Sequence, residues 1–152
     1  EDTGAAQYLR DARITAIYEG TNGIQAMDLV GRKMMDGGEA AFALMDEWDD
    51  HCRDHTLSPF VLGAIAELRA ATTYLQGQVP QDRNAGAVAY LRGFARVMGA
   101  VMHLRAAQAD PARAPLAEFY ITRLLPETTG LFAQARAGAG GIYALGVDAL
   151  SG

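Results

Sequence analysis

The stretch that decides the fold is residues 58–109, SPFVLGAIAELRAATTYLQGQVPQDRNAGAVAYLRGFARVMGAVMHLRAAQA. Its first half has the period of a helix that buries one face, with the facing positions at Val61, Ile65, Leu68, Thr72 and Leu75. Ser58 and Pro59 are typical of a helix start, as N-cap and first helical residue, and Gly77 is typical of a helix end. The second half predicts a longer helix from about Asp82 to Ala109, with an apolar side formed by Ala87, Leu91, Phe94, Met98 and Val101.

The other long segments repeat this helical period, and none alternates convincingly as a strand. Before residue 58 the pattern predicts a helix from Ile24 to Met35, ended by Gly37-Gly38, and another from Glu39 to about Thr56. The buried stripe of this second helix is expected to be Ala41, Met45, Trp48, Cys52 and His55. The connections between the predicted helices are short, which favours antiparallel neighbours. We therefore expect an all-α fold, an antiparallel helical bundle.

The last major helix is predicted after Pro115 and contains a proline. Its buried positions would be Ala117, Ile121, Leu125, Thr128, Phe132 and Ala135. Pro126 lies inside this run and should bend the helix sharply, because it leaves the carbonyl of Thr122 without a donor. The glycine-rich segment 138–141 should end or loosen the helix before residues 142–150.

Glycines are frequent inside these predicted helices. Gly63, Gly86, Gly93 and Gly99 each cost roughly 1 kcal/mol relative to alanine in a helix interior. Close packing of a neighbouring helix against these glycines is one way in which the cost could be compensated.

Composition excludes several classes of protein. The chain has 152 residues, half of them hydrophobic and a fifth charged, as in a globular domain with a sizeable core. A net charge of −5 without a basic cluster speaks against nucleic acid, and no apolar run is long enough to cross a membrane. A single cysteine, Cys52, excludes an intrachain disulfide and suits a reducing compartment such as the cytoplasm.

No metal site is predicted. His51 and His55 have a helical spacing that can bind zinc, but no distant Cys or His pair completes the ligands. A packed core cysteine between two ordinary histidines is the preferred interpretation of this segment. The acidic residues from Asp46 to Asp54 lack the glycine turn of a calcium loop and are expected to be a solvated helix face.

Residues 18–25, YEGTNGIQ, hold the candidate chemistry. Residues 5–18 predict a helix, and Glu19 follows in its last turn, where the helix dipole and burial would both raise the pKa of its carboxyl group. Gly20 suits the helix end, and Thr21 or Asn22 can cap the next helix, with Gln25 placed for a capping box on Asn22. Gly23 leaves the new N-terminus open to an anionic group. An ordinary helix corner with a solvated Glu19 is the alternative that these residues leave open.

The run from Tyr8 to Gln25 resembles the acyl-CoA dehydrogenase signature. The resemblance implies that Glu19 is the catalytic base that removes the α-proton of an acyl thioester and that Gly20 contacts the substrate. It implies that Thr21, Asn22 and Gly23 contact FAD, although many relatives carry glutamine at the position of Gly23. It further implies an acyl-CoA substrate, an electron-transfer flavoprotein as partner and a homo-oligomeric enzyme.

The remainder resembles the extra C-terminal helical domain of one bacterial subgroup, which includes 3-methylmercaptopropionyl-CoA dehydrogenases. The resemblance is carried by Phe119-Tyr120, by residues 123–127 (RLLPE) and by residues 90–92 (YLR). On this reading, residues 1–36 end the catalytic helical domain and residues 37–152 form an appended bundle. Because the chain lacks an initiator Met and begins inside the signature, we expect the C-terminal piece of a longer enzyme, inactive by itself. The alternative from another class is a non-catalytic helical interaction or oligomerisation module.

Overall fold

A computed structural model of the chain describes residues 4–15 and 21–150. Within these ranges the chain is helical and contains no strand, which confirms the all-α fold. The elements are α1 (Ala5–Ile14), α2 (Asn22–Asp28), the π-helical turn η1 (Leu29–Lys33), α3 (Glu39–His51), α4 (Ser58–Gln76), α5 (Pro80–Ala109), the short 3-10 turn η2 (Pro111–Arg113), α6 (Ala114–Arg123), α7 (Glu127–Ala135), α8 (Gly140–Tyr143) and α9 (Val147–Leu150).

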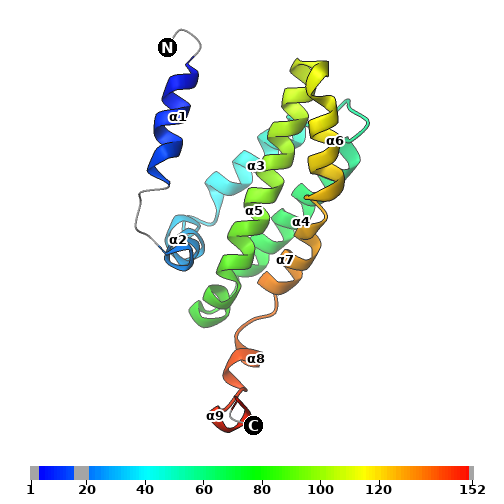
Figure 1. The fold of residues 1–152 in the computed structure, drawn as a ribbon. Helices are drawn as coiled ribbons and strands as arrows, with labels where there is room; N and C mark the ends of the chain where they lie inside the picture. The colour runs from blue at the N-terminus through cyan, green and yellow to red at the C-terminus, as the bar shows by residue number, and fades with distance from the viewer. Residues whose placement is uncertain (1–3, 16–20, 151–152) are drawn as a thin grey trace.

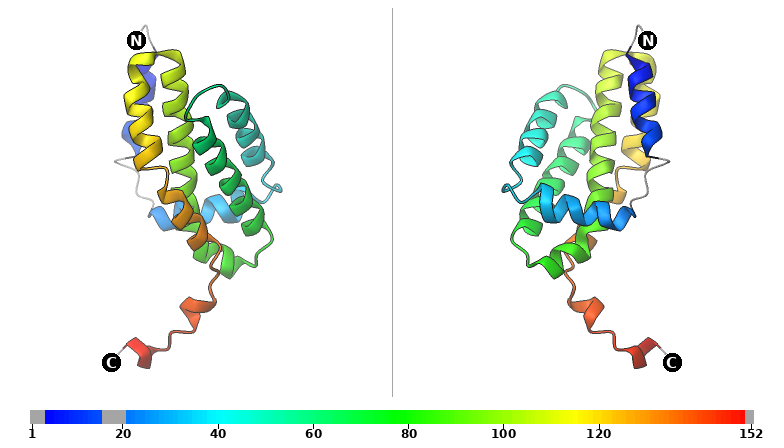
Figure 2. Two further views of the ribbon diagram at one scale, coloured as in Figure 1. Left: turned by 90° about the vertical axis from the view of Figure 1, so that its right-hand side faces the viewer. Right: turned by 90° about the vertical axis from the view of Figure 1, so that its left-hand side faces the viewer.

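Helix α5 is the centre of the bundle (Figures 1 and 2). It is 30 residues long and contacts α2, η1, α4, α6 and α7, while α3 packs on the outside of α4. Because neighbours surround it, α5 buries residues on several faces: Gly86, Ala87, Ala89, Tyr90, Gly93, Val97, Ala100, Val101, Leu104 and Ala107. Leu91 and Phe94 are only partly buried and Met98 is 43% exposed. The predicted apolar side of this helix was therefore partly wrong, because small residues, rather than the largest apolar ones, mark the closest helix contacts.

Three of the four helix-interior glycines lie at such contacts. A Cβ on Gly86 would overlap the carbonyl group of Ala135 in α7, and one on Gly93 would overlap the ring of Phe132. A Cβ on Gly99 would collide with the hydroxyl end of Tyr120 in α6. Close packing thus explains these three glycines. Gly63 differs, because no atom lies within 4 Å of the Cβ that it lacks.

Helix α4 follows the prediction closely, whereas α3 is shorter than predicted. The expected positions from Val61 to Leu75 are buried, and α4 ends one residue before Gly77. It begins one residue earlier than predicted, because Ser58 is already helical and Leu57 is the N-cap. Helix α3 buries Met45 and Trp48 but stops at His51, about five residues earlier than the pattern suggested. Asp54 then takes a left-handed conformation with φ of 66°, and the hydroxyl of Ser58 accepts a hydrogen bond from the His55 backbone N–H at 3.0 Å. The turn is therefore held by its own polar contacts, which the apolar period does not encode.

Pro126 interrupts the last major helix completely. Residues 124–126 form a turn, so that α6 and α7 are separate helices that both pack on α5 (Figure 1). The backbone N–H groups of Leu124 and Leu125 both reach the carbonyl of Tyr120, at 2.9 and 3.0 Å, and the Thr128 hydroxyl donates to the carbonyl of Leu125 at 2.7 Å. The chain therefore breaks where a bend was predicted, and the backbone N–H groups just before Pro126 are paired within the turn.

The helices near the two ends of the chain are not packed into the bundle as the central helices are. Helix α1 has no buried residue, and Tyr8 and Leu9 are 79% and 64% exposed. At the other end, α8 and α9 extend away from the bundle (Figure 2). The Asp82 carboxylate accepts a hydrogen bond from the backbone N–H of Ala139 at 2.8 Å and so joins the start of this segment to α5.

Candidate functional site

Thr21 caps the helix that follows the signature. Its backbone is extended, with φ of −60° and ψ of 139°, and its hydroxyl oxygen accepts a hydrogen bond from the backbone N–H of Ile24 at 3.3 Å. Asn22 is the first helical residue, and the backbone N–H of Gln25 donates to the carbonyl of Thr21 at 3.2 Å. The cap is therefore Thr21, and the Asn22–Gln25 capping box does not form. Extended geometry at the N-cap leaves a hydroxyl in reach of the first turn, as the cap preference requires.

The cofactor-contacting candidates surround an open helix start. Thr21 and Asn22 are exposed and Gly23 is partly exposed, with no atom within 4 Å of the position of its missing Cβ. The first N–H groups of a helix lack intrahelical partners, so this end offers backbone donors and the Asn22 amide to a polar group. Glu19 and Gly20, the candidate base and substrate contact, lie outside the described residues.

Helix α2 and η1 attach this end of the motif to the bundle. Ala26, Val30 and Met34 are spaced four residues apart and are buried in the same hydrophobic core as α4 and α5. The π-helical turn carries the buried face on to Met34, whose backbone N–H donates to the carbonyl of Leu29 at 3.1 Å. Thr21 to Gly23 therefore have a fixed relation to the bundle, although they lie at its periphery.

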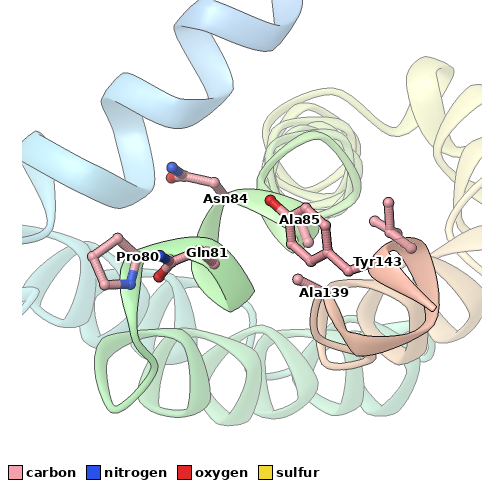
Figure 3. A pocket seen from close by; sticks show the side chains of 7 residues that line it. Pro80, Gln81, Asn84, Ala85, Ala139 and Tyr143 are labelled. Carbon is pink, nitrogen blue, oxygen red and sulfur yellow. The ribbon is translucent and has the colours of Figure 1, made fainter. Parts of the chain in front are cut away.

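The groove drawn in Figure 3 lies at a different place on the molecule. It has a volume of about 420 Å³ and lies between the start of α5 and the α8 segment. Its polar groups include the side-chain amides of Gln81 and Asn84, and the ring of Tyr143 forms one side. A groove with amides and one phenol but no carboxylate or imidazole provides no acid–base pair for catalysis.

Two buried or partly buried polar contacts were not anticipated from the sequence. The hydroxyl groups of Tyr90 and Thr72 lie 2.8 Å apart in the core, and Thr72 also donates to the carbonyl of Leu68 at 2.8 Å. Burial raises the pKa of Tyr90 to about 12. Between α5 and α7, Glu127 is paired with Arg92 and, at 2.7 Å, with Arg96; the hydrogen bond from Arg96 lowers the pKa of the Glu127 carboxyl group. The i, i+4 spacing of the two arginines was the signal available for this pairing.

Cys52 is a packed core residue, as expected. It is fully buried, and burial, with the nearby Asp49 carboxylate, raises the pKa of its thiol to about 11. His51 is exposed and its Nδ1 contacts the Glu47 carbonyl at 2.6 Å, while His55 Nδ1 accepts from the Leu57 backbone N–H at 3.1 Å. In residues 4–15 and 21–150, no three His, Cys, Asp or Glu side chains are grouped so that they could hold a metal ion.

None of the helices in these ranges combines the length and the apolar character needed to span a bilayer.

Comparison with known proteins identifies the family of the chain. A family described as acetyl-CoA dehydrogenase C-terminal like matches residues 44–146, which include α4 to α8. The chain belongs to this family. It is also 36% identical, over 149 residues, to a 3-methylmercaptopropionyl-CoA dehydrogenase of Ruegeria pomeroyi. That alignment covers 88% of this chain and 25% of the relative, so the chain spans about a quarter of the length of the curated protein that it matches. Membership of an acyl-CoA dehydrogenase family, expected from the signature, is thereby confirmed.

Proposed function

We propose that this chain is the C-terminal part of an FAD-dependent acyl-CoA dehydrogenase, which converts an acyl-CoA thioester to the trans-2-enoyl-CoA. The observation that carries the proposal is the family match over residues 44–146 together with the 36% identity to a dehydrogenase of a CoA thioester. The signature in residues 8–25 adds support from a part of the chain that lies outside the residues matched by the family. In the whole protein, residues 1–36 would complete the catalytic helical domain and residues 37–152 would form the appended bundle.

The residues present fit a flavin contact at the start of α2. Thr21 and Asn22 offer exposed polar groups, and Gly23 leaves room for close approach to the backbone. When bound, FAD supplies the acceptor for the hydride that leaves the β-carbon, and its electrons would pass to an electron-transfer flavoprotein. Glu19 would remove the α-proton, and Gly20 would pack against the thioester. A base at a helix end has a raised pKa if it is desolvated, which makes its carboxylate a stronger acceptor for a carbon-bound proton.

The proposal also covers the partners and the location of the full-length protein. An acyl-CoA substrate and assembly of the full-length protein into a homo-oligomer are part of the proposal, as is a cytoplasmic location. The free thiol of Cys52 is compatible with a reducing compartment.

The test is the substitution Glu19→Gln in the full-length protein. The amide keeps the shape of the side chain and removes its basicity, so flavin should stay bound while dehydrogenation falls by at least ~100-fold, the scale of a lost general base. The assay is bleaching of the flavin absorbance on addition of acyl-CoA. Glu118→Gln, the same chemical change at an exposed position of α6, is the matched control and should bleach normally. Normal bleaching in Glu19→Gln would reject the proposed base and leave the non-catalytic module as the better account of this segment.

A further inference from the structure

A small pocket beside η1 is lined by two side chains whose hydrogen-bond donors have no acceptor. It has a volume of about 130 Å³ and is lined by Val30, Met34, Met35, Gly37, Gln76 and Arg83. Two nitrogen atoms of these lining residues, Arg83 Nε and Gln76 Nε2, are buried and have no hydrogen-bond partner. Buried N–H groups are nearly always paired in folded proteins, so two unpaired donors at one pocket indicate a missing acceptor.

The charge of Arg83 is also unbalanced. Its guanidinium group makes a weak hydrogen bond from Nη1 to the sulfur of Met35 at 3.4 Å, and no carboxylate of residues 4–15 and 21–150 lies within 4.0 Å of it. Arg83 also lies in the first turn of α5, where the helix dipole disfavours a cation and favours an anion. Two acidic residues are adjacent in sequence to residues of the pocket, and both accept hydrogen bonds from other groups: Asp36 from the Gly38 backbone N–H at 2.8 Å, and Asp82 from the Ala139 backbone N–H at 2.8 Å.

We propose that this pocket binds a small oxyanion, a phosphate or a carboxylate group, between Arg83 and Gln76. A planar guanidinium beside an amide N–H matches the acceptor geometry of such a group, and charge-assisted hydrogen bonds of this kind are the strong ones. Water could pair with either donor, whereas an oxyanion accepts from both and is also attracted by the charge of the partly buried guanidinium. The apolar wall formed by Val30 and Met34 admits the carbon stem of a carboxylate as well as a free ion. The site is separate from the signature and does not depend on the proposed dehydrogenase activity.

The test uses the 152-residue chain and two probes, inorganic phosphate and acetate, titrated at constant ionic strength. Binding should appear as saturable changes in the NMR signals of the Gln76 side-chain amide and the Gly37 backbone amide. In Arg83→Gln the apparent affinity should fall about tenfold or more. Arg123→Gln removes the same charge at an exposed site and should stay within about twofold of the wild type. A preference for phosphate indicates a free phosphate ligand, whereas equal responses to both probes indicate a carboxylate from another part of the protein or a partner.

Gln76→Glu provides a second, independent variant, which is informative even if Arg83→Gln fails to fold. The new carboxylate would pair with Arg83 within the chain, so the phosphate response should disappear and the thermal midpoint in phosphate-free buffer should rise. No saturable response in the wild type, or equal responses in wild type and Arg83→Gln, would overturn the proposal. Those outcomes would assign the donors to water or to the carbonyl end of a reoriented Gln76 amide.

Discussion

Gly86 is a residue at which two helices pack closely, because the backbone of α7 lies directly against it. An added Cβ would meet the carbonyl group of Ala135, which cannot move as a flexible side chain would. We therefore predict that Gly86→Ala lowers the free energy of unfolding by about 1–3 kcal/mol, the usual cost of overpacking a core. Urea unfolding followed by far-ultraviolet circular dichroism measures this change.

Gly63→Ala is the matched control, since Gly63 is also inside a helix but is exposed and has no atom near its missing Cβ. There the substitution should raise the stability by up to about 1 kcal/mol, because alanine restricts the unfolded chain and favours the helix. Equal effects of the two substitutions would show that helix propensity alone, and not the contact between α5 and α7, determines the role of Gly86.

Tyr90 makes stability depend on alkaline pH. Its pKa is raised by burial from 10.0 to about 12, so the unfolded chain loses the phenolic proton at a lower pH than the folded chain does. The stabilisation is complete below pH 10 and is lost as the pH rises from about 10 to about 12, by on the order of 3 kcal/mol. The buried thiol of Cys52, with its pKa raised to about 11, adds a loss that begins at lower pH.

Tyr90→Phe should therefore flatten the fall of stability between about pH 10 and pH 12. At neutral pH the variant should be less stable by about 1 kcal/mol, because the hydrogen bond to Thr72 is lost while Thr72 keeps its bond to Leu68. The measurement is urea unfolding at a series of pH values. Tyr143→Phe, at a ring that is 76% exposed, is the control and should leave the profile of the wild type intact. An unchanged slope in Tyr90→Phe would contradict this account.

At the scale of the element, the start of α2 depends on one side chain. Thr21 is the residue whose hydroxyl accepts from the first turn, whereas Asn22 is already helical. Thr21→Ala should cost about 1 kcal/mol of stability and speed amide exchange at Ile24, because an N-cap oxygen is lost. Asn22→Ala, one residue further, removes no cap and should have a much smaller effect. The reverse order would mean that Asn22 is the functional cap in solution.

The longer helices show when the spacing of apolar residues is enough to predict the buried face and the ends of a helix. The spacing of Val61, Ile65 and Leu68 predicted α4 correctly, since one face of that helix is buried and the other is exposed to solvent. Helix α5 is surrounded by several neighbours, so its apolar period does not identify a single buried face. Similarly, α3 ends at His51 because a polar turn at Asp54 and Ser58 follows it. The spacing of apolar residues carries no information about such a turn.

At the scale of the whole molecule, the described chain offers FAD little more than one helix start. Thr21, Asn22 and Gly23 provide polar contacts but too little enclosed surface for a cofactor of that size, since ligand sites bury most of the ligand. We predict that the 152-residue chain folds but neither retains FAD through gel filtration nor oxidises acyl-CoA. Flavin absorbance that co-elutes with the isolated chain would contradict this prediction. The full-length protein, run in parallel, is the positive control.

Some of what is known here was determined by the sequence alone. Helical periods, proline and glycine punctuation and the absence of strand alternation predicted the all-α fold, because each acts within a few neighbouring residues. The signature in residues 8–25 likewise named the candidate base and the flavin contacts, since a motif preserves local chemistry. Glu19 and Gly20 stay predictions, as they lie outside the described residues.

The tertiary structure decided which of these local features meet. It brought Gly86 against Ala135, Tyr90 to Thr72, and Arg83 to Gln76 at one pocket. The two members of each pair belong to different helices. The local sequence pattern of each helix would be the same if the other helix were absent. Their contacts depend on the rotation and crossing of whole helices, which are set by the summed packing of the core and by no short stretch of the chain.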